Sequence, residues 1–467
     1  MARYNFGQGV ADFVVTPTDG IWAVAPDTPI TFWTEPVEGT AYTDLLSEGG
    51  IPVTSIASDE YGQIPRFAGP TGVTGMWADA GGPSRAWVEA HGALPTHFGV
   101  YVPPGWGTVW KAQRAASGLA RIVVAGDSLS QGYFASDLTN SSWVGLVRQA
   151  LQTQYGDGGS GFYSTSRSSA VMSASAGALA AWEANNSIAT LTGTWTLGAL
   201  NFGPGITFIQ AAAAATATFQ VSGSIVKIFN ISGAAPRAGF TYTIDGGAAV
   251  PVPVTIGPTG VQVTTVTGLT EGEHTVTIGW DGAVSEILYL VGVAGENTAG
   301  VVVDNLARAG SRSSHWANGN ILNSPYNGGT GYPADLVICS LGLNDAANAV
   351  TGADWSANMG TYLRAVRAAH DGETDILLLL HHIGDYGSTA GAAAYHTYAA
   401  QFQSLAAAYG AATVNLWAQG RNSWDYWNGL GYWGDGTTPG PAGTDLVHAS
   451  DAGHAYIASQ VLPILTS

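Results

Sequence analysis

The middle of the chain contains the stretch Arg121-Ile122-Val123-Val124-Ala125-Gly126-Asp127-Ser128-Leu129-Ser130. Its apolar run, residues 122–125, predicts a strand buried on both faces, as the strands of parallel sheets are. Ser128 follows the run, which places its hydroxyl at the carboxyl edge of the sheet, where such folds form their ligand crevices. A serine in this position is suited to act as a nucleophile, although Asp and Ser are also common in ordinary turns.

Downstream of this strand the sequence alternates between helical and strand-like segments. Apolar residues recur at helical spacing in 143–151. Strands are expected at the apolar runs, and helices at the longer segments between them: strands at 301–303, 336–339, 376–380 and 412–416, and helices at 354–370, 392–409 and about 452–462. Apolar strands separated by helices imply a parallel, three-layer α/β/α sheet.

Two segments of different composition precede and interrupt this pattern. Residues 1–95 are rich in Gly, Pro, Thr and aromatic residues and predict a small β-rich domain, followed by a linker at 96–118. Residues 191–300 show alternating β-branched segments with Asp-Gly turns. They predict an antiparallel β-sandwich inserted into a sheet domain of residues 119–190 and 301–467. The sandwich either braces the sheet domain or binds carbohydrate, and the sequence leaves both open.

Composition narrows the class of protein. The 467 residues are enough for about three domains. Hydrophobic residues make up 46% and charged residues 10%, which excludes an intrinsically disordered chain. The net charge of −18 would repel a phosphate backbone, so nucleic acid is not expected as a partner. Cys339, the single cysteine, forms no internal disulfide, and we expect neither a signal peptide nor a membrane span.

A hydroxyl attacks poorly without a base, so Ser128 requires a histidine, and the histidine requires an acid that orients it. Asp445 and His448 meet that need, since an acid three positions before the histidine can curl under the ring and accept from one nitrogen. Asp451 and His454 have the same spacing. Because Asp451 falls at the start of the last predicted helix, where a carboxylate caps free N–H groups, we interpret this second pair as structural.

Acyl transfer also needs donors aimed at the negative oxygen of the tetrahedral intermediate. Asn344, in Gly342-Leu343-Asn344-Asp345, follows the predicted strand that ends at Cys339, so its amide can reach over the same edge of the sheet. Gly310, in the loop after the strand at 301–303, permits close approach of a backbone N–H. Each signal alone fits an ordinary turn, but together they surround one edge of the sheet.

In order and context, this set resembles the four sequence blocks of the SGNH (GDSL) hydrolases: 126–129, Gly310, 342–345 and 445–448. The resemblance spans about residues 118–190 and 301–467. It implies a flavodoxin-like domain with Ser128 as nucleophile, His448 as general base and Asp445 as its orienter. It also implies an oxyanion hole made by the backbone N–H groups of Ser128 and Gly310 and the side chain of Asn344. Ala449 stands where the family often has proline.

Segments of the first 95 residues are similar to N-terminal parts of minor tail or fibre proteins of phages of actinobacteria, among them 43–47, 52–53, 64–65 and 77–79. The resemblance implies a place in the virion, contact with other phage tail proteins, assembly into a homotrimer and action at the host cell surface. The alternative is a small β domain that merely packs on the hydrolase.

Aromatic and histidine residues near the same sheet edge are candidates for substrate contacts. Trp424, Trp427 and Trp433 stand in a Gly-rich loop before the acid–base pair, where they form either a stacking surface for a sugar or acyl chain, or part of the core. His381 and His382 follow another predicted strand. We interpret both as candidate substrate contacts. Because adjacent residues of a strand point to opposite faces, we expect no metal there, and we expect no cofactor.

The leading hypothesis is a serine esterase or deacylase, carried on a phage tail, that removes ester-linked acyl groups from glycans or glycolipids of the host envelope. Ser128 would attack the ester, and water would resolve the acyl-enzyme. One alternative is a receptor-binding tail protein in which the hydrolase fold grips its ligand without catalysis. Another is a lipase-like esterase for longer acyl chains.

Overall fold

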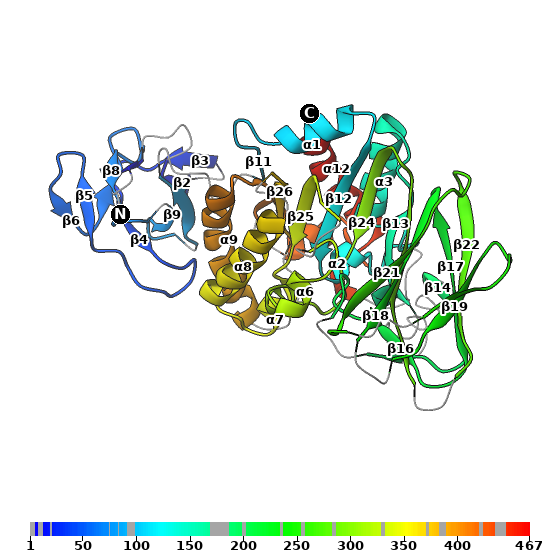
Figure 1. Cartoon of the computed structure of the whole chain (residues 1–467). Coiled ribbons are helices and arrows are strands. Elements are labelled where there is room, and N and C mark those ends of the chain that lie inside the picture. Colours follow the sequence, from blue (N-terminus) through cyan, green and yellow to red (C-terminus); the bar gives the residue numbers. More distant parts are fainter. Residues whose placement is uncertain are drawn as a thin grey trace. The chain divides into compact units, whose positions relative to one another are not determined.

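The computed structural model (Figure 1) describes residues 5–7, 13–18, 21–73, 75–82, 84–90, 99–168, 186–198, 202–233, 237–253, 257–282, 286–327, 332–369, 373–382, 389–419, 424–434 and 445–467. The chain divides into two compact units, Met1–Phe98 and Gly99–Ser467. Within the described ranges, no helix combines the length and the apolar character needed to cross a lipid bilayer.

The described part of the first unit consists of short strands and turns. One sheet has the order β1-β8-β5-β6, a second has the order β10-β9-β4-β7, and β2 pairs with β3. Residues Phe6, Phe32, Phe67 and Met76 are at most 1% exposed and form its core. The bounds of its strands are β1 Asn5–Phe6, β2 Val15–Thr18, β3 Ile21–Val24, β4 Pro29–Trp33, β5 Leu45–Ser47, β6 Pro52–Val53, β7 Ile56–Ala57, β8 Phe67–Ala68, β9 Gly75–Asp79 and β10 Ala86–Glu89.

Five parallel strands form the centre of the second unit. In spatial order they are β27 (Ala412–Asn415), β26 (Asp375–Leu380), β25 (Leu336–Ser340), β12 (Leu119–Gly126) and β24 (Gly300–Asn305). Numbered along the chain, this is the order 2-1-3-4-5 of flavodoxin-like sheets. The direction of winding reverses between β12 and β25, which makes the ends of these two strands the place where such folds bind ligands.

Helices cover this sheet in two groups. α3 (Trp143–Tyr155) packs against β24 and α12 (Asp451–Thr466), whereas α8 (Gly352–Ala369) packs against α9 (Thr389–Tyr409). The connections β12-α3-β24 and β25-α8-β26 run in opposite directions, so right-handed crossovers place their helices on opposite faces. The shorter helices are α1 Thr108–Ala115, α2 Ser128–Gln131, the 3-10 helix η1 Thr165–Arg167, α5 Ser313–Trp316, α6 Gly319–Leu322, α7 Leu343–Ala347, α10 Leu416–Gln419 and α11 Trp424–Gly429.

The region between β13 (Gly161–Ser164) and β24 forms two antiparallel layers that share an apolar core. One layer is a separate sheet of the order β14-β17-β22-β19-β20. The other is continuous with the central sheet, because β13 pairs with β24 on one side and with β23 on the other. The strands are β14 Ala189–Thr192, β15 Thr196–Leu197, β16 Ile209–Ala211, β17 Ala215–Ser222, β18 Ile225–Ser232, β19 Phe240–Ile244, β20 Val250–Val252, β21 Gly260–Val266, β22 Glu273–Trp280 and β23 Leu288–Glu296.

Residues 99–118, which the sequence assigned to a linker, are part of the second unit. β11 (Val100–Tyr101) pairs antiparallel with β27 at the edge of the central sheet. The indole of Trp106 donates to the carbonyl of Ile376 at 2.8 Å, and that of Trp110 donates to the carbonyl of Leu465 at 2.9 Å. These two buried indoles hold the segment against the sheet, which is why it does not behave as a free connection.

Candidate active site

Ser128 begins helix α2 directly after β12 ends at Gly126. Gly126 is required by close packing, because an added Cβ would lie 2.5 Å from the side chain of Ser130. Asp127 is the N-cap of the helix, and its Oδ1 accepts from the N–H of Leu129 at 3.1 Å. The Ser128 N–H stands at the first position of the helix, where a helix offers no internal acceptor. The Gly-Asp-Ser sequence therefore builds a compact turn that presents the serine.

His448 lies within hydrogen-bond distance of this serine. Its Nε2 is 2.8 Å from Ser128 Oγ, although 320 residues separate the two along the chain. The imidazole ring is stacked on Phe134 at 5.4 Å between centroids and is tilted against Tyr133 at 5.3 Å. These two rings follow α2 in sequence, so the segment that carries the serine also restricts the histidine.

The third member of the predicted triad can be placed only in part. Asp445 begins β29 (Asp445–Ala449), which pairs with β28 (Trp433–Gly434). Its side chain lies outside the described residues, so its role as orienter of His448 stays a prediction.

The predicted oxyanion donors lie in two loops that contact each other. Gly310 has a φ of +74°, which favours glycine, and an added Cβ there would meet no atom within 4 Å. Asn344 Nδ2 donates to the carbonyl of Ser311 at 3.1 Å, and Ser311 Oγ donates to the carbonyl of Gly126 at 2.9 Å. An amide nitrogen has two hydrogens, so this bond leaves Asn344 one further N–H to donate. Ser311 thus links the turn before Ser128, the Gly310 loop and α7.

Sequence reasoning missed two amides that hold the loops at this edge. Asn305 Nδ2 donates to the carbonyl of Ser130 at 2.8 Å, and Gln131 Nε2 donates to the carbonyl of Ser166 at 3.0 Å. Gln131 also accepts from the N–H of Ala309. Both amides are buried. Their positions in the sequence could have indicated this role, because each stands beside one of the predicted motif blocks. A buried amide in such a place must find hydrogen-bond partners.

Two buried carboxyl groups lie behind the candidate nucleophile. Asp345 accepts from both the N–H and the hydroxyl of Ser313, at 3.0 and 2.5 Å, and this pairing fixes α7 to α5, which precedes it in the chain. Asp127 is fully buried, and its burial, with a further contribution from Asp345, raises its pKa to about 7. The carboxyl next to Ser128 is therefore half-protonated near neutral pH.

The structure corrects the predicted substrate contacts at two histidines and two tryptophans. His381 and His382 are 1% and 0% exposed, and Trp427 and Trp433 are each 2% exposed. The ring of His382 lies 4.3 Å from those of both tryptophans, and His381 bonds to the hydroxyl of Ser340. Burial lowers the pKa of His381 to about 3, so it is neutral at neutral pH. All four side chains are core, because their aromatic faces pack on one another.

Two other predictions concern residues close to these. The side chain of Trp424 lies outside the described residues, and its backbone begins α11. In the competing pair, His454 accepts from the N–H of Trp143 at 3.3 Å and donates to the carbonyl of Tyr133 at 3.1 Å. The cap of α12 is Ser450 and not Asp451, which instead accepts from the N–H of Ser136 at 2.7 Å. This pair therefore fixes the loop that carries Tyr133.

The described residues contain no group of three or more His, Cys, Asp or Glu side chains arranged to hold a metal ion.

Residues 274–456 match the GDSL-like lipase/acylhydrolase family. A peptidoglycan O-acetylesterase of known structure is 18% identical, with a TM-score of 0.54 and coverage of 76% of this chain and 95% of that chain. A Bacillus subtilis protein is 15% identical (TM-score 0.30, coverage 58% and 86%), and a family two carbohydrate esterase from Cellvibrio japonicus is 12% identical (0.25, 59% and 97%). No curated protein matches the chain.

The family match and the geometry complement each other. The matched residues include Gly310, Asn344 and His448, whereas Ser128 lies before them in the chain. The tertiary structure supplies the serine, at 2.8 Å from His448. Residues 274–456 are therefore similar to the GDSL-like lipase/acylhydrolases, the α/β fold is shared with an O-acetylesterase, and the chain is a serine hydrolase.

Proposed function

We propose that this hydrolase removes ester-linked acyl groups, acetyl above all, from the sugars of a cell-envelope glycan or glycolipid. The observation that carries the reaction is the hydrogen bond between Ser128 Oγ and His448 Nε2. Ser128 Oγ attacks the ester carbonyl carbon while its proton moves to Nε2. The imidazolium then protonates the departing sugar oxygen, and water, activated by the same histidine, hydrolyses the acyl-enzyme to acid and free serine.

The negative charge of the tetrahedral intermediate needs donors, and three surround the serine in our assignment. They are the N–H groups of Ser128 and Gly310 and the second N–H of Asn344. The fixed turn at Gly310 and the bond from Asn344 to Ser311 hold two of them in place before substrate arrives. Donors that need no reorganisation stabilise the developing oxyanion more than mobile ones do.

The substrate half of the proposal draws on the peptidoglycan O-acetylesterase whose fold this chain shares. We extend it to the setting implied by the first unit, which resembles phage tail proteins: a trimeric tail component that deacylates the envelope of the host. In this setting, removal of the acyl groups by the enzyme would expose the glycan surface to the virion.

The reaction is tested by following acetate release from O-acetylated peptidoglycan and hydrolysis of p-nitrophenyl esters of increasing chain length. We expect acetate release by the wild type, preference for short acyl chains, and labelling by a fluorophosphonate probe that is absent in Ser128→Ala. Preference for long chains would favour a lipase-like enzyme. Absence of both labelling and hydrolysis in folded protein that still binds envelope glycan would favour a receptor-binding protein.

The setting is tested separately. We expect light scattering to give the mass of three chains, and antibodies against the full chain to decorate the tails of virions that encode it. A monomer that leaves virions undecorated would remove the tail assignment while leaving the esterase assignment intact.

A further inference from the structure

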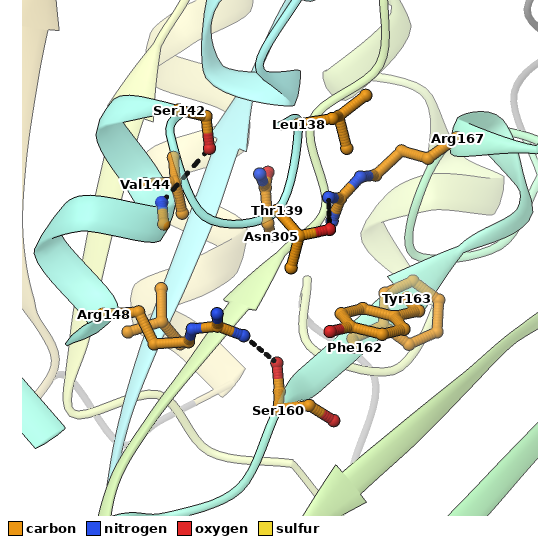
Figure 2. Close-up of a pocket in the computed structure, with 12 residues that line it drawn as sticks. Leu138, Thr139, Ser142, Val144, Arg148, Ser160, Phe162, Tyr163, Arg167 and Asn305 are labelled. Carbon is orange, nitrogen blue, oxygen red and sulfur yellow. Dashed lines mark hydrogen bonds between the residues drawn. The ribbon is translucent and has the colours of Figure 1, made fainter. Parts of the chain in front are cut away.

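A second polar site lies along the loop that follows α2. The loop residues 138–142, helix α3, β13 and η1 enclose a small cavity (Figure 2). Arg148 of α3 and Arg167 of η1 both point into it from opposite sides. A larger groove of about 430 Å³ shares Thr139 and Tyr163 with this cavity. The groove adjoins the cavity through these two residues, whereas both arginines line the cavity.

Neither arginine forms an ion pair with any residue that the structure describes. Arg167 is 2% exposed, and its Nη2 donates to Thr139 Oγ1 at 3.1 Å. Arg148 donates to the carbonyl of Ser160 at 3.4 Å and to Asn140 Oδ1 at 3.0 Å. The Nε–H of each guanidinium is buried and has no acceptor among the residues that the structure describes. The cavity thus holds two positive groups with unused donors.

Asp137, an acid of the same loop, forms no ion pair with either arginine. The carboxylate of Asp137 accepts from the N–H groups of Thr139 and Asn140 at 2.8 and 3.0 Å and from the Asn140 side chain at 2.8 Å. Burial, together with the like charge of Arg148, lowers the pKa of Arg167 to about 10. Arg167 is still charged at neutral pH, and a buried charge without a partner is strongly unfavourable.

An oxyanion would satisfy this arrangement. Guanidinium groups bind carboxylate and phosphate through paired, charge-assisted hydrogen bonds. Besides the acids Asp137 and Glu273, the groove beside them is lined by hydroxyl and amide side chains of two elements, the loop and the sheet that contains β14, β17 and β22; among them are Asn186, Thr190, Thr218 and Gln220. Such groups both donate to and accept from the hydroxyls of a sugar.

The cavity and the candidate active site are joined by one short loop. Phe134 stacks on His448, and Thr139 bonds to Arg167. A fully extended chain would place these two loop residues at most about 18 Å apart. A single oligosaccharide is long enough to reach both sites.

We propose that Arg148 and Arg167 form a subsite for an oxyanion, a carboxylate or phosphate group, on the glycan from which Ser128 removes an acyl group. The position of this subsite on the substrate rests on the proposed function. The binding of the oxyanion itself does not, because it requires no reaction at Ser128.

The test is isothermal titration of the full chain carrying Ser128→Ala with trigalacturonic acid and with neutral galactotriose. We expect the acid to bind and the neutral sugar to bind at least about 10-fold more weakly, since charge-assisted hydrogen bonds distinguish them. Arg148→Gln in the same background is expected to weaken binding of the acid about 10- to 100-fold. Arg364→Gln, which removes an exposed arginine of α8, is the matched control for net charge.

A second variant and a second pair of ligands complete the test. Arg167→Lys retains a positive charge if Arg167→Gln fails to fold, and we expect it to keep part of the selectivity for the acid. Mannose 6-phosphate compared with galacturonate identifies the preferred oxyanion as phosphate or carboxylate. Equal affinity for acid and neutral sugar, or a loss in Arg148→Gln no larger than in Arg364→Gln, would overturn the subsite.

Activity measurements separate this inference from the proposed reaction. The ratio of kcat/KM for a carboxylated to a neutral acetylated oligosaccharide is expected to fall about 10- to 100-fold in Arg148→Gln, mainly through KM. Selective binding of the acid by a chain without esterase activity would reject the reaction and keep the subsite. Esterase activity without selective binding would reject the subsite alone.

Discussion

Strand β12 carries a polar group near each end, and the two are held in opposite ways. Near its start, the buried Arg121 pairs with Glu296 of β23 at 3.0 Å and with Asp304 of β24. Lys227 of β18 adds a second positive charge to Glu296 at 2.5 Å. Just past the end of β12, Ser128 forms a single hydrogen bond with His448 at 2.8 Å. One end links strands of the same extended sheet, and the other presents groups for chemistry.

The electrostatics of the two ends differ accordingly. Although burial opposes it, the charges of Arg121 and Lys227 lower the pKa of Glu296, so this carboxylate is ionised and paired. At the other end, burial and the proximity of Asp345 raise the pKa of Asp127 to about 7. Paired charges stabilise the fold as long as no partner is removed. An unpaired carboxyl beside the nucleophile makes stability depend on pH.

The largest expected effect is at the end of β12. Ser128→Ala is expected to lower esterase kcat about 10⁴- to 10⁶-fold, because the hydroxyl is the group that forms the acyl-enzyme. The melting temperature should stay close to that of the wild type, since the change removes one side-chain oxygen. Steady-state hydrolysis of p-nitrophenyl acetate and a thermal melt measure the two quantities. Substantial activity in this variant would move the nucleophile elsewhere.

The next effect is at the start of β12 and concerns stability. Arg121→Met is expected to lower the free energy of unfolding by about 3–5 kcal/mol, because Asp304 stays buried without its partner and Glu296 keeps Lys227 alone. Urea denaturation measures the change, with Arg364→Met, at an exposed position of α8, as a control expected to change stability by less than about 0.5 kcal/mol. The esterase rate of the folded fraction should be retained. An unchanged midpoint would mean that the pairing does not brace the strands of this sheet.

A smaller loss of activity is expected at the oxyanion donor. Asn344→Ala should lower kcat about 10²- to 10³-fold, as for the loss of one donor to the tetrahedral intermediate. The lost bond to Ser311 should reduce stability by only about 1 kcal/mol. Asn348→Ala removes an exposed amide at the end of the same helix and should leave kcat unchanged. Equal rates in the two variants would take Asn344 out of the oxyanion hole.

The smallest expected effect is a pH dependence at Asp127. Its pKa is about 7 in the folded protein and close to the ordinary aspartate value of 3.8 when unfolded, so the folded state binds more protons between these values and loses stability as pH rises. Asp127→Asn cannot titrate, so its stability relative to the wild type should increase from pH 5 to pH 7, by up to about 2–3 kcal/mol. Denaturation at several pH values measures this. A difference that does not vary with pH would contradict the raised pKa.

The sequence predicted the groups at the end of β12 better than those at its start. Ser128 and His448 could be predicted because a nucleophile and its base act from positions after strands or in loops at the edge of the sheet. Those positions can be located in the sequence once the strands are predicted. Arg121 did not stand out, since a lone arginine at the start of an apolar run gives no sign of where its acids lie. Glu296 and Asp304 are far from it in sequence and meet it only through strand pairing.

At the aromatic cluster the sequence suggested substrate contacts where the structure has core side chains. Trp427 and Trp433 in a Gly-rich loop fitted a stacking surface for a sugar as well as they fitted a core. They are buried because His382, which follows β26, packs its ring against both. The composition of a loop does not show which distant ring will pack on it. The sequence alone therefore could not distinguish a stacking surface from a core.

Local patterning was sufficient for the parallel strands, the helices between them and the identity of the reacting groups, because hydrophobic period and turn chemistry act over a few residues. Folding in three dimensions was needed for whatever depends on long-range contact. It joined β23 to the central sheet through β13, brought His448 to Ser128, and left Arg167 without an acid while giving Arg121 two. Whether a buried charge is a brace or a binding site depends on its partners, and those come from distant parts of the chain.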